Sequence, residues 1–274
     1  MPSHHQSTTH GWPQPLVERL LDEGLAAAAA TPVIGVSGLQ GTGKSTLAAQ
    51  LSQAGAARGL CVATLSIDDV YLDRPERERL AAEVHPLLAT RGPPGTHDLA
   101  LAADVLDGLR ASATPPAIPR FDKLRDRRLP ASAWTRLPAR PDVVVFEGWF
   151  LGTPPEPPEA LGPPVNALER DEDPDGRWRR YCNAALARYQ PLWRRIDRLV
   201  FLAPPGFEVV PRWRMQQERA LAAADPGARP MDEAALLRFV QHYERVSRQA
   251  LRTLPALADR VIRIDVHREV REEE

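Results

Sequence analysis

The sequence predicts an α/β fold in which a mostly parallel sheet of about five strands carries helices on both faces. Two observations support this prediction. Short apolar runs recur along the 274-residue chain, and stretches with helical spacing of apolar residues separate most of them. Strands of a parallel sheet are covered on both faces, so they read as continuous apolar runs. We expect one domain over residues 16–268, preceded by a mobile start at residues 1–15.

The elements follow one another in the order that such a sheet requires. Residues 16–29 have four leucines at helical spacing, which predicts a helix. The apolar run PVIGVSG at residues 32–38 predicts a buried strand, and a second helix begins near Lys44. Four further strands are predicted at residues 61–67 (CVATLSI), 142–148 (DVVVFEG), 197–203 (DRLVFLA) and 259–265 (DRVIRID).

More helices are predicted where apolar residues return to a spacing of three or four. They are residues 98–109, residues 231–251 and a helix that starts within residues 211–218. Proline clusters in GTPPEPPEALGPP, residues 152–164. Because proline lacks the N–H that helices and sheets need, we interpret this segment as an exposed loop inserted in the single domain.

Composition narrows the class of protein. The 35 Lys and Arg residues nearly balance the 36 Asp and Glu residues, which argues against a nucleic-acid partner. The two cysteines, Cys61 and Cys182, lie far apart, so neither a disulfide framework nor a zinc site is expected. No apolar run reaches the roughly 18 residues that span a membrane. We therefore expect a cytoplasmic protein with neither a nucleic-acid nor a membrane partner.

The segment VSGLQGTGKST contains the pattern G-x-x-x-x-G-K-[ST] at residues 38–45, here named the phosphate loop. The glycines allow a tight turn whose N–H groups point at phosphate oxygens, and the following helix adds the positive end of its dipole. Lys44 is placed to reach the β- and γ-phosphates, and Ser45 to offer its hydroxyl to Mg²⁺. An ordinary glycine-rich turn is the alternative. Nucleotide contacts are predicted for Gly38, Gln40, Gly41, Thr42, Gly43, Lys44, Ser45 and Thr46.

Acidic residues follow two of the predicted strands. SIDDVYL ends the second strand with Asp68 and Asp69, and VVVFEG ends another with Glu147. Ligands of parallel sheets bind outside the carboxyl ends of the strands, which places these acids near the phosphate loop. An acid here can accept the proton of an attacking hydroxyl and help to hold Mg²⁺. Successive residues leaving a strand point in different directions, and we favour Asp68 for this role; a helix or turn cap is the alternative for both.

Two cationic loops suit an anionic substrate. RGPPGTHDL (residues 91–99) carries Arg91 and His97, and IPRFDKLRDRR (residues 118–128) carries Arg120 and Lys123. The alternatives are that Asp98 only caps the helix after it and that the charges only form a solvated face.

Arginines also begin the helix within residues 211–218, PRWRMQQE. Arg212 and Arg214 lie two residues apart and so on different faces of that helix. An arginine on a lid segment can neutralise charge that develops on a transferred group. Ordinary surface arginines are the alternative.

Taken in order, these motifs resemble the D-glycerate 3-kinase group of the uridine kinase, pantothenate kinase and phosphoribulokinase-like family. The match extends from about residue 32 to about residue 265. SIDDVYL, RGPPGTHD and FEGWFLG are specific to the glycerate kinase-like branch, whereas the phosphate loop is shared with many unrelated proteins. PRFDK followed by DR, and a late WRMQ, complete the series.

The resemblance implies a P-loop NTPase fold with a helical lid region, ATP and Mg²⁺ as cofactors, and phosphorylation of an alcohol group. By position it gives catalytic roles to Lys44, Asp68 and Arg214, and metal contacts to Ser45, Asp68 and Glu147. The acceptor-pocket loops of these kinases correspond to segments carrying Asp69, Tyr71, Arg91, His97, Asp98, Arg120 and Lys123.

The leading hypothesis is ATP-dependent phosphorylation of a small anionic metabolite, D-glycerate to 3-phosphoglycerate. Pantothenate-like acids and nucleosides are the alternative acceptors. A regulatory ATPase or GTPase is the alternative class, but a GTPase would carry an N-K-x-D stretch after a later strand, and the sequence has none.

Overall fold

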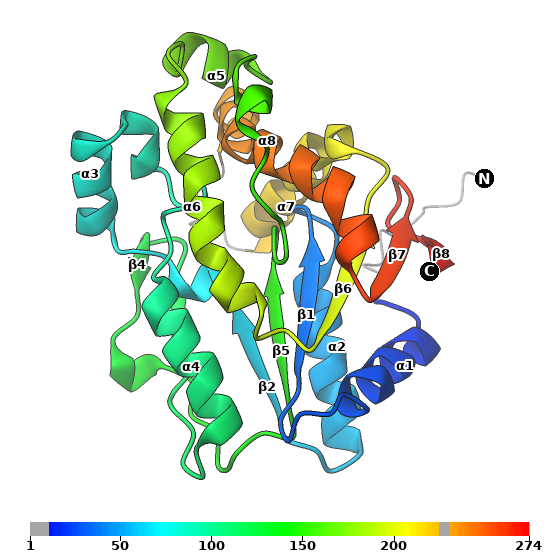
Figure 1. Cartoon of the computed structure of the whole chain (residues 1–274). Coiled ribbons are helices and arrows are strands. Elements are labelled where there is room, and N and C mark those ends of the chain that lie inside the picture. Colours follow the sequence, from blue (N-terminus) through cyan, green and yellow to red (C-terminus); the bar gives the residue numbers. More distant parts are fainter. Residues whose placement is uncertain (1–10, 225–230, 274) are drawn as a thin grey trace.

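The computed structural model describes residues 11–224 and 231–273. Its centre is a six-stranded sheet in the order β2-β5-β1-β6-β7-β8, in which all pairs are parallel except β7 with β8 (Figure 1). The strands are β1 (Val33–Gly38), β2 (Val62–Ser66), β5 (Val143–Gly148), β6 (Arg198–Ala203), β7 (Arg260–Ile264) and β8 (Val270–Glu273). The predicted α/β fold and its five parallel strands are confirmed.

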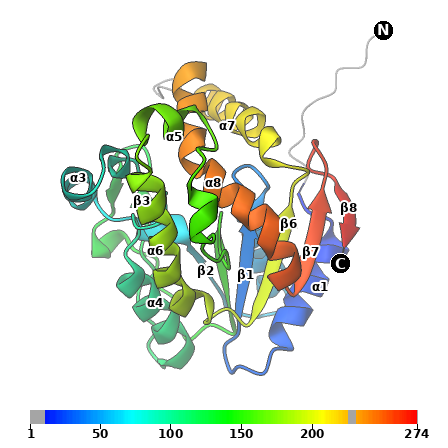
Figure 2. The same cartoon turned by 45° about the horizontal axis from the view of Figure 1, so that its top comes forward.

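Helices cover both faces of the sheet (Figures 1 and 2). α4 (Leu99–Ala111), α6 (Arg177–Trp193) and α8 (Glu233–Leu257) pack on one face, and α1 (Gln14–Leu25) and α2 (Lys44–Ala57) pack on the other. In β5, Val144 belongs to the first core and Val145 to the second. Because successive strand residues face opposite sides, a strand with a core on each side must be apolar at every position.

The remaining elements connect these layers. The predicted lid helix is α7 (Val210–Ala224), which lies beside α8 (Figure 2). The cationic loop at residues 118–128 contains a small antiparallel hairpin, and the other connections contain two helices and five 3₁₀ helices. These elements are β3 (Phe121–Asp122), β4 (Arg127–Arg128), α3 (Arg74–Glu83), α5 (Ala167–Glu172), η1 (Ile67–Val70), η2 (Pro86–Ala89), η3 (Ala131–Ala133), η4 (Pro158–Leu161) and η5 (Phe207–Val209).

The strand register brings the predicted site residues to one edge of the sheet. Val36 of β1 and Ser66 of β2 both lie opposite Glu147 of β5. The end of β1 leads into the phosphate loop, and the end of β2 leads into Asp68. The two motifs and Glu147 therefore meet at the carboxyl edge, as the parallel sheet predicts.

The start of the chain differs from the prediction. The helix expected over residues 16–29 begins at Gln14 and ends at Leu25, because the alanines that follow have no apolar face to bury. Residues 11–15 were expected to belong to a mobile start, yet Trp12 is buried. Its backbone N–H and C=O both bond to the Gln50 side chain, at 2.7 and 2.9 Å. Residues 1–10 lie outside the described residues.

Two further boundaries were not predicted. β8 has the sequence VREE, which lacks an apolar run, and it is the edge strand of the sheet, paired with β7. α8 continues past the expected end at residue 251 to Leu257, because Leu254 is still buried in the core.

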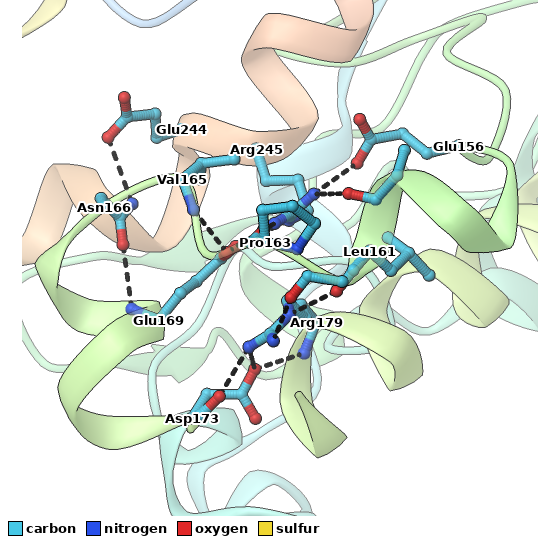
Figure 3. A network of polar contacts seen from close by, with 12 residues as sticks. Glu156, Leu161, Pro163, Val165, Asn166, Glu169, Asp173, Arg179, Glu244 and Arg245 are labelled. Carbon is cyan, nitrogen blue, oxygen red and sulfur yellow. Dashed lines mark hydrogen bonds and ion pairs between the residues drawn. The ribbon is translucent and has the colours of Figure 1, made fainter. Parts of the chain in front are cut away.

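The proline-rich segment at residues 152–164 was expected to be an exposed loop, and this is confirmed only in part. Residues 157–159 and 162–164 are exposed, whereas Thr153, Glu156 and Leu161 are buried. Two buried arginines bind its backbone (Figure 3). Arg245 of α8 donates to the carbonyl oxygens of Ala160 and Pro163, at 3.0 and 2.7 Å, and Arg179 of α6 donates to those of Leu161 and Gly162, at 2.7 and 2.9 Å. Proline removes N–H donors but keeps carbonyl acceptors, so such a loop can be docked by arginines.

Both arginines also form buried ion pairs (Figure 3). Arg245 pairs with Glu169 at 2.6 Å and with Glu156 at 3.2 Å, and Arg179 pairs with Asp173 at 3.0 Å. The buried charges are thereby compensated, and the network joins the proline-rich loop and α5 to α6 and α8.

Among the described residues, no helix combines the length and apolar character that crossing a membrane requires.

Candidate active site

The phosphate loop connects β1 to α2 and has the conformation that its glycines allow. Gly41 and Gly43 have φ of 85° and 90°, in the left-handed region where a side chain is strained. Gly43 immediately precedes α2, so the helix begins at Lys44 with its N-terminus at the loop. The N–H groups of the first helical turn and the positive end of the helix dipole meet there, as phosphate binding requires.

A cavity of about 220 Å³ opens beside the loop. Ten predicted site residues line it: Gln40, Gly41, Lys44, Ser45, Asp68, Tyr71, Arg91, Lys123, Glu147 and Arg214. Four of the predicted nucleotide-contact residues, Gly38, Thr42, Gly43 and Thr46, lie outside this lining. Thr42 is buried and donates its hydroxyl to the Leu39 carbonyl at 2.8 Å, whereas Thr46 is exposed on α2.

Asp68 is the centre of a polar cluster in the cavity. Its Oδ1 accepts the Tyr71 hydroxyl at 2.6 Å, and its Oδ2 accepts Lys123 Nζ at 2.6 Å. Burial would raise the pKa of Asp68, but the Lys123 ammonium and the Tyr71 hydroxyl outweigh it and hold that pKa at about 2. Asp68 is therefore ionised at neutral pH, and both of its oxygens are engaged.

Lys44, Ser45 and Glu147 form the opposite part of the cluster. Ser45 Oγ donates to Glu147 Oε1 at 3.0 Å, and Lys44 Nζ donates to the Leu39 carbonyl at 3.1 Å. Burial lowers the pKa of Lys44, against the opposing charges of Glu147 and Asp68. Burial raises the pKa of Glu147, and the Lys44 charge opposes this shift. Burial thus disfavours the charged form of both groups, and the neighbour of opposite charge offsets part of that effect.

The carboxylate oxygens of Asp68 and Glu147 and the Ser45 hydroxyl suit a magnesium ion. Mg²⁺ prefers oxygen ligands and is usually held by one or two carboxylates together with substrate phosphates. The Asp68 carboxylate contributes to the raised pKa of Glu147, so the two acids are close enough to repel each other. A cation near both would relieve that repulsion. Within residues 11–224 and 231–273 no three His, Cys, Asp or Glu side chains gather as a metal-binding group, so further ligands would have to come from Ser45, phosphate and water.

Asp69 and Arg120, both predicted to bind substrate, do not line the cavity. Arg120 Nη1 donates to Asp69 Oδ2 at 2.9 Å, and the backbone N–H groups of Ser66 and Phe121 donate to the same carboxylate. Asp69 therefore caps the turn that presents Asp68. The expectation that only one of the two adjacent acids faces the phosphate loop agrees with this geometry, because a turn directs neighbouring side chains to opposite sides.

His97 and Asp98 lie behind the cavity wall. The His97 ring contacts the Tyr71 ring with centroids 4.9 Å apart, and its Nδ1 is 2.7 Å from the Tyr189 hydroxyl. Burial lowers the pKa of His97 to about 4, so the ring is neutral at neutral pH. Asp98 accepts the Leu101 N–H at 3.0 Å as the N-cap of α4, which is the capping role considered as the alternative.

Two arginines contribute positive charge to the cavity. Arg91 donates to Asp126 at 2.7 Å, and Arg214 on α7 bonds to Gln217 and Glu218, at 2.8 Å each. Arg212 instead donates to a backbone carbonyl at Val266, away from the lining. Of these two arginines of α7, Arg214 therefore lines the cavity, whereas Arg212 binds the turn between β7 and β8.

Sequence reasoning missed four residues of the lining: Trp149, Gln217, Phe239 and Tyr243. Tyr243 lies in the helix predicted over residues 231–251, and its hydroxyl donates to the Arg91 carbonyl at 2.8 Å. Its ring packs against Trp149 and Phe239, each with centroids 5.1 Å apart. The position of Trp149, two residues beyond Glu147 at the end of β5, was a signal that could have identified it.

Comparison with known proteins identifies relatives over most of the chain, although no protein-family model matches it. The chain is 35% identical over 225 residues to an uncharacterised kinase of Schizosaccharomyces pombe, covering 77% of this chain and 78% of that protein. It is 30% identical over 253 residues to the chloroplastic D-glycerate 3-kinase of Arabidopsis thaliana, covering 86% of this chain but only 53% of the plant protein. The structure of a D-glycerate 3-kinase from Cryptococcus neoformans superposes with a TM-score of 0.75 at 25% identity, covering 95% of this chain and 97% of that one.

Proposed function

Because this chain belongs to the P-loop kinase family that includes D-glycerate 3-kinases, we propose that it transfers the γ-phosphate of ATP to D-glycerate and yields 3-phosphoglycerate. Family membership makes the chain an ATP-dependent small-molecule kinase. The acceptor and the 3-position are the proposal, and two relatives with the name D-glycerate 3-kinase support them.

The observation that carries the proposal is the composition of the cavity. The phosphate-loop residues Lys44 and Ser45 share it with the cations Arg91 and Lys123 and with the ionised Asp68. A small hydroxy acid has a carboxylate that cations can bind and a hydroxyl that a carboxylate can orient. Holding both ends would place the hydroxyl for attack on the γ-phosphate.

The polar cluster around Asp68 indicates how the reaction would proceed. A substrate carboxylate competes with Asp68 for Lys123 and so releases Oδ2, which then accepts a hydrogen bond from the substrate hydroxyl. As the hydroxyl oxygen bonds to the γ-phosphorus, the bond from that phosphorus to the ADP oxygen breaks. The hydroxyl proton passes to Asp68.

The cations of the cavity stabilise charge during this transfer. Lys44 and Arg214 provide fixed positive charge beside the phosphates, which is most effective in a site that is already organised for it. Ser45, Asp68 and Glu147 would hold Mg²⁺, which neutralises phosphate charge when bound.

Product identification tests the proposal. The purified protein is incubated with Mg²⁺-ATP and D-glycerate, and the product is identified by ³¹P and ¹H NMR. Formation of 3-phosphoglycerate supports the proposal, and 2-phosphoglycerate would exclude the 3-position. No phosphoglycerate, together with activity on pantothenate or a nucleoside, would exclude glycerate as the acceptor. ADP release that needs no acceptor, or that nucleic acid stimulates, would contradict a kinase role.

Lys44→Ala is expected to lower kcat by about 10²–10³-fold without loss of the fold, by analogy with removal of one preorganised transition-state contact. The Lys44 side chain lines the cavity, and among the described contacts its ammonium makes one hydrogen bond, to the Leu39 carbonyl. The fold should therefore tolerate its removal. The rate of ADP release and the circular dichroism spectrum are measured together. Near-native turnover in a folded variant would contradict the role of the phosphate loop.

Arg91→Ala is expected to raise KM for D-glycerate about 10–100-fold, because a charge-assisted hydrogen bond to the carboxylate is lost. KM for ATP should stay close to native. Arg125→Ala is the matched control: it removes the same charge from the β3–β4 turn, where Arg125 is exposed and pairs with Asp122 outside the cavity lining. Equal effects of the two substitutions would indicate general electrostatic attraction instead of a specific contact.

A further inference from the structure

Two tryptophans that do not belong to the phosphate-loop pattern contact the loop from outside the cavity. Trp12, just before α1, donates its indole Nε1–H to the Gly43 carbonyl at 3.0 Å. Trp213 of α7 packs so close to Gly41 that a Cβ on this glycine would lie 2.6 Å from Trp213 Cβ. Their exposed fractions are 9% and 0%. We propose that these tryptophans brace the loop and are positioning residues for nucleotide binding.

The contact from Trp12 acts on the peptide group between Gly43 and Lys44. The Gly43 carbonyl also accepts the Leu47 N–H at 2.9 Å, as the first bond of α2. In a planar trans peptide the C=O and N–H groups point in opposite directions. The Trp12 indole and the Leu47 N–H together fix the position of the Gly43 oxygen. The Lys44 N–H of the same peptide group therefore points out of the helix N-terminus, toward the place where phosphate binds.

The backbone of Trp12 is itself fixed to α2. Its backbone N–H donates to Gln50 Oε1 at 2.7 Å, and its carbonyl accepts from Gln50 Nε2 at 2.9 Å. The Gln50 side chain thus bonds both polar backbone groups of Trp12. Because Gln50 lies on the helix that starts at the phosphate loop, the indole is fixed relative to the loop it contacts.

The contact at Gly41 involves Trp213 and Arg268 of the turn between β7 and β8. Arg268 Nε donates to the Gly41 carbonyl at 2.7 Å, and its guanidinium lies 4.9 Å from the Trp213 ring centroid. Neither Trp213 nor Arg268 lines the cavity, so the Gly41 carbonyl oxygen points toward Arg268 and not into the cavity. The negative end of this peptide dipole is kept away from bound phosphates. Trp213 immediately precedes Arg214, so the same contact sets the position of a cavity arginine relative to the loop.

Trp12→Phe tests the brace, because it keeps an aromatic ring and removes only the N–H donor and the second ring. The dissociation constant of ATP, measured by calorimetric titration without acceptor, is expected to rise about 2–10-fold, as expected for one hydrogen bond. KM for ATP should rise by a similar factor, while KM for the acceptor stays close to native. The midpoint of thermal unfolding should fall moderately, because Trp12 is buried and the smaller ring leaves a cavity. A tryptophan that only filled space would lower the midpoint in the same way but leave ATP affinity unchanged.

Trp134→Phe is the matched control, since the Trp134 indole donates to another backbone carbonyl, that of Leu129, at 2.8 Å and outside the cavity lining. Native ATP affinity in Trp12→Phe, or an equal loss in Trp134→Phe, would overturn the proposal. If Trp12→Phe does not fold, Gln50→Leu gives the test, because it releases the Trp12 backbone; native ATP affinity in that variant would overturn the brace.

The titration is independent of the acceptor, so failure of D-glycerate as a substrate leaves the result interpretable. The inference rests only on the phosphate loop as the nucleotide site. A wild-type protein that bound no ATP would overturn both the brace and the kinase function.

Discussion

Asp68→Asn is expected to lower kcat by about 10²–10⁴-fold, the usual contribution of a positioned proton acceptor. The amide is almost the same size as the carboxylate but cannot take the proton of the attacking hydroxyl. It also breaks the ion pair with Lys123, whose Nζ lies 2.6 Å from Oδ2. The substitution acts on the transfer step, so KM for ATP should change far less than kcat. Steady-state ADP release at saturating acceptor measures both values.

Asp69→Asn is the control for Asp68→Asn. The Asp69 side chain does not line the cavity, and its carboxylate instead bonds to Arg120 and to the backbone of its own turn. We expect a smaller loss of kcat, arising from a loosened turn. A larger loss at Asp69 than at Asp68 would reverse the two roles.

Arg245→Met is expected to lower the free energy of unfolding by about 3–5 kcal/mol, the typical effect of removing one partner of a buried ion pair. Glu169 is fully buried and pairs with Arg245 through both carboxylate oxygens. Methionine can fill much of the space of the arginine stem, but it leaves the Glu169 carboxylate without this cation. It also leaves two carbonyl oxygens of the proline-rich loop without their donor. Urea denaturation provides the measurement.

Arg238→Met on the same helix is the matched control. Arg238 pairs with Glu172 at 2.6 Å, but the two side chains are 51% and 41% exposed. Such a pair contributes about 0–1 kcal/mol. Adding Glu169→Gln to Arg245→Met should recover part of the loss, since the uncompensated charge is then removed. Equal losses for Arg245→Met and Arg238→Met would show that burial does not govern the strength of these pairs.

The parts of the fold that could be predicted are those that depend on neighbouring residues. The phosphate loop is specified by glycine spacing within eight positions, and its dihedral angles follow from Gly41 and Gly43. The five parallel strands could be recognised because burial on two faces requires continuous apolar runs. That at most one of Asp68 and Asp69 faces the phosphate loop could be predicted because successive residues after a strand point in different directions.

The parts that could not be predicted depend on contacts between distant residues. Arg120 is a cation in a suitable loop, but its side chain bonds to Asp69, 51 positions earlier, and does not line the cavity. Arg245 was one charge on a long helix, and its partners Glu169 and Glu156 precede it by 76 and 89 positions. Composition gives the charge of a loop, whereas the direction of a side chain depends on which partner the fold brings near. The buried network of Figure 3 is therefore invisible in any local pattern.

β8 has a consequence for how the molecule behaves beside other copies of itself. The last strand of a sheet presents unpaired N–H and C=O groups, which can recruit a strand of another molecule and start aggregation. Without β8, the strand β7 would offer such an edge, but β8 covers it with an antiparallel pairing whose register shifts at Arg263 and Ile264. Arg271 and Glu272 of β8 are exposed. A short, charged and irregular strand is a poor template for further pairing, so β8 protects the parallel core strands from edge-to-edge association in a crowded cell.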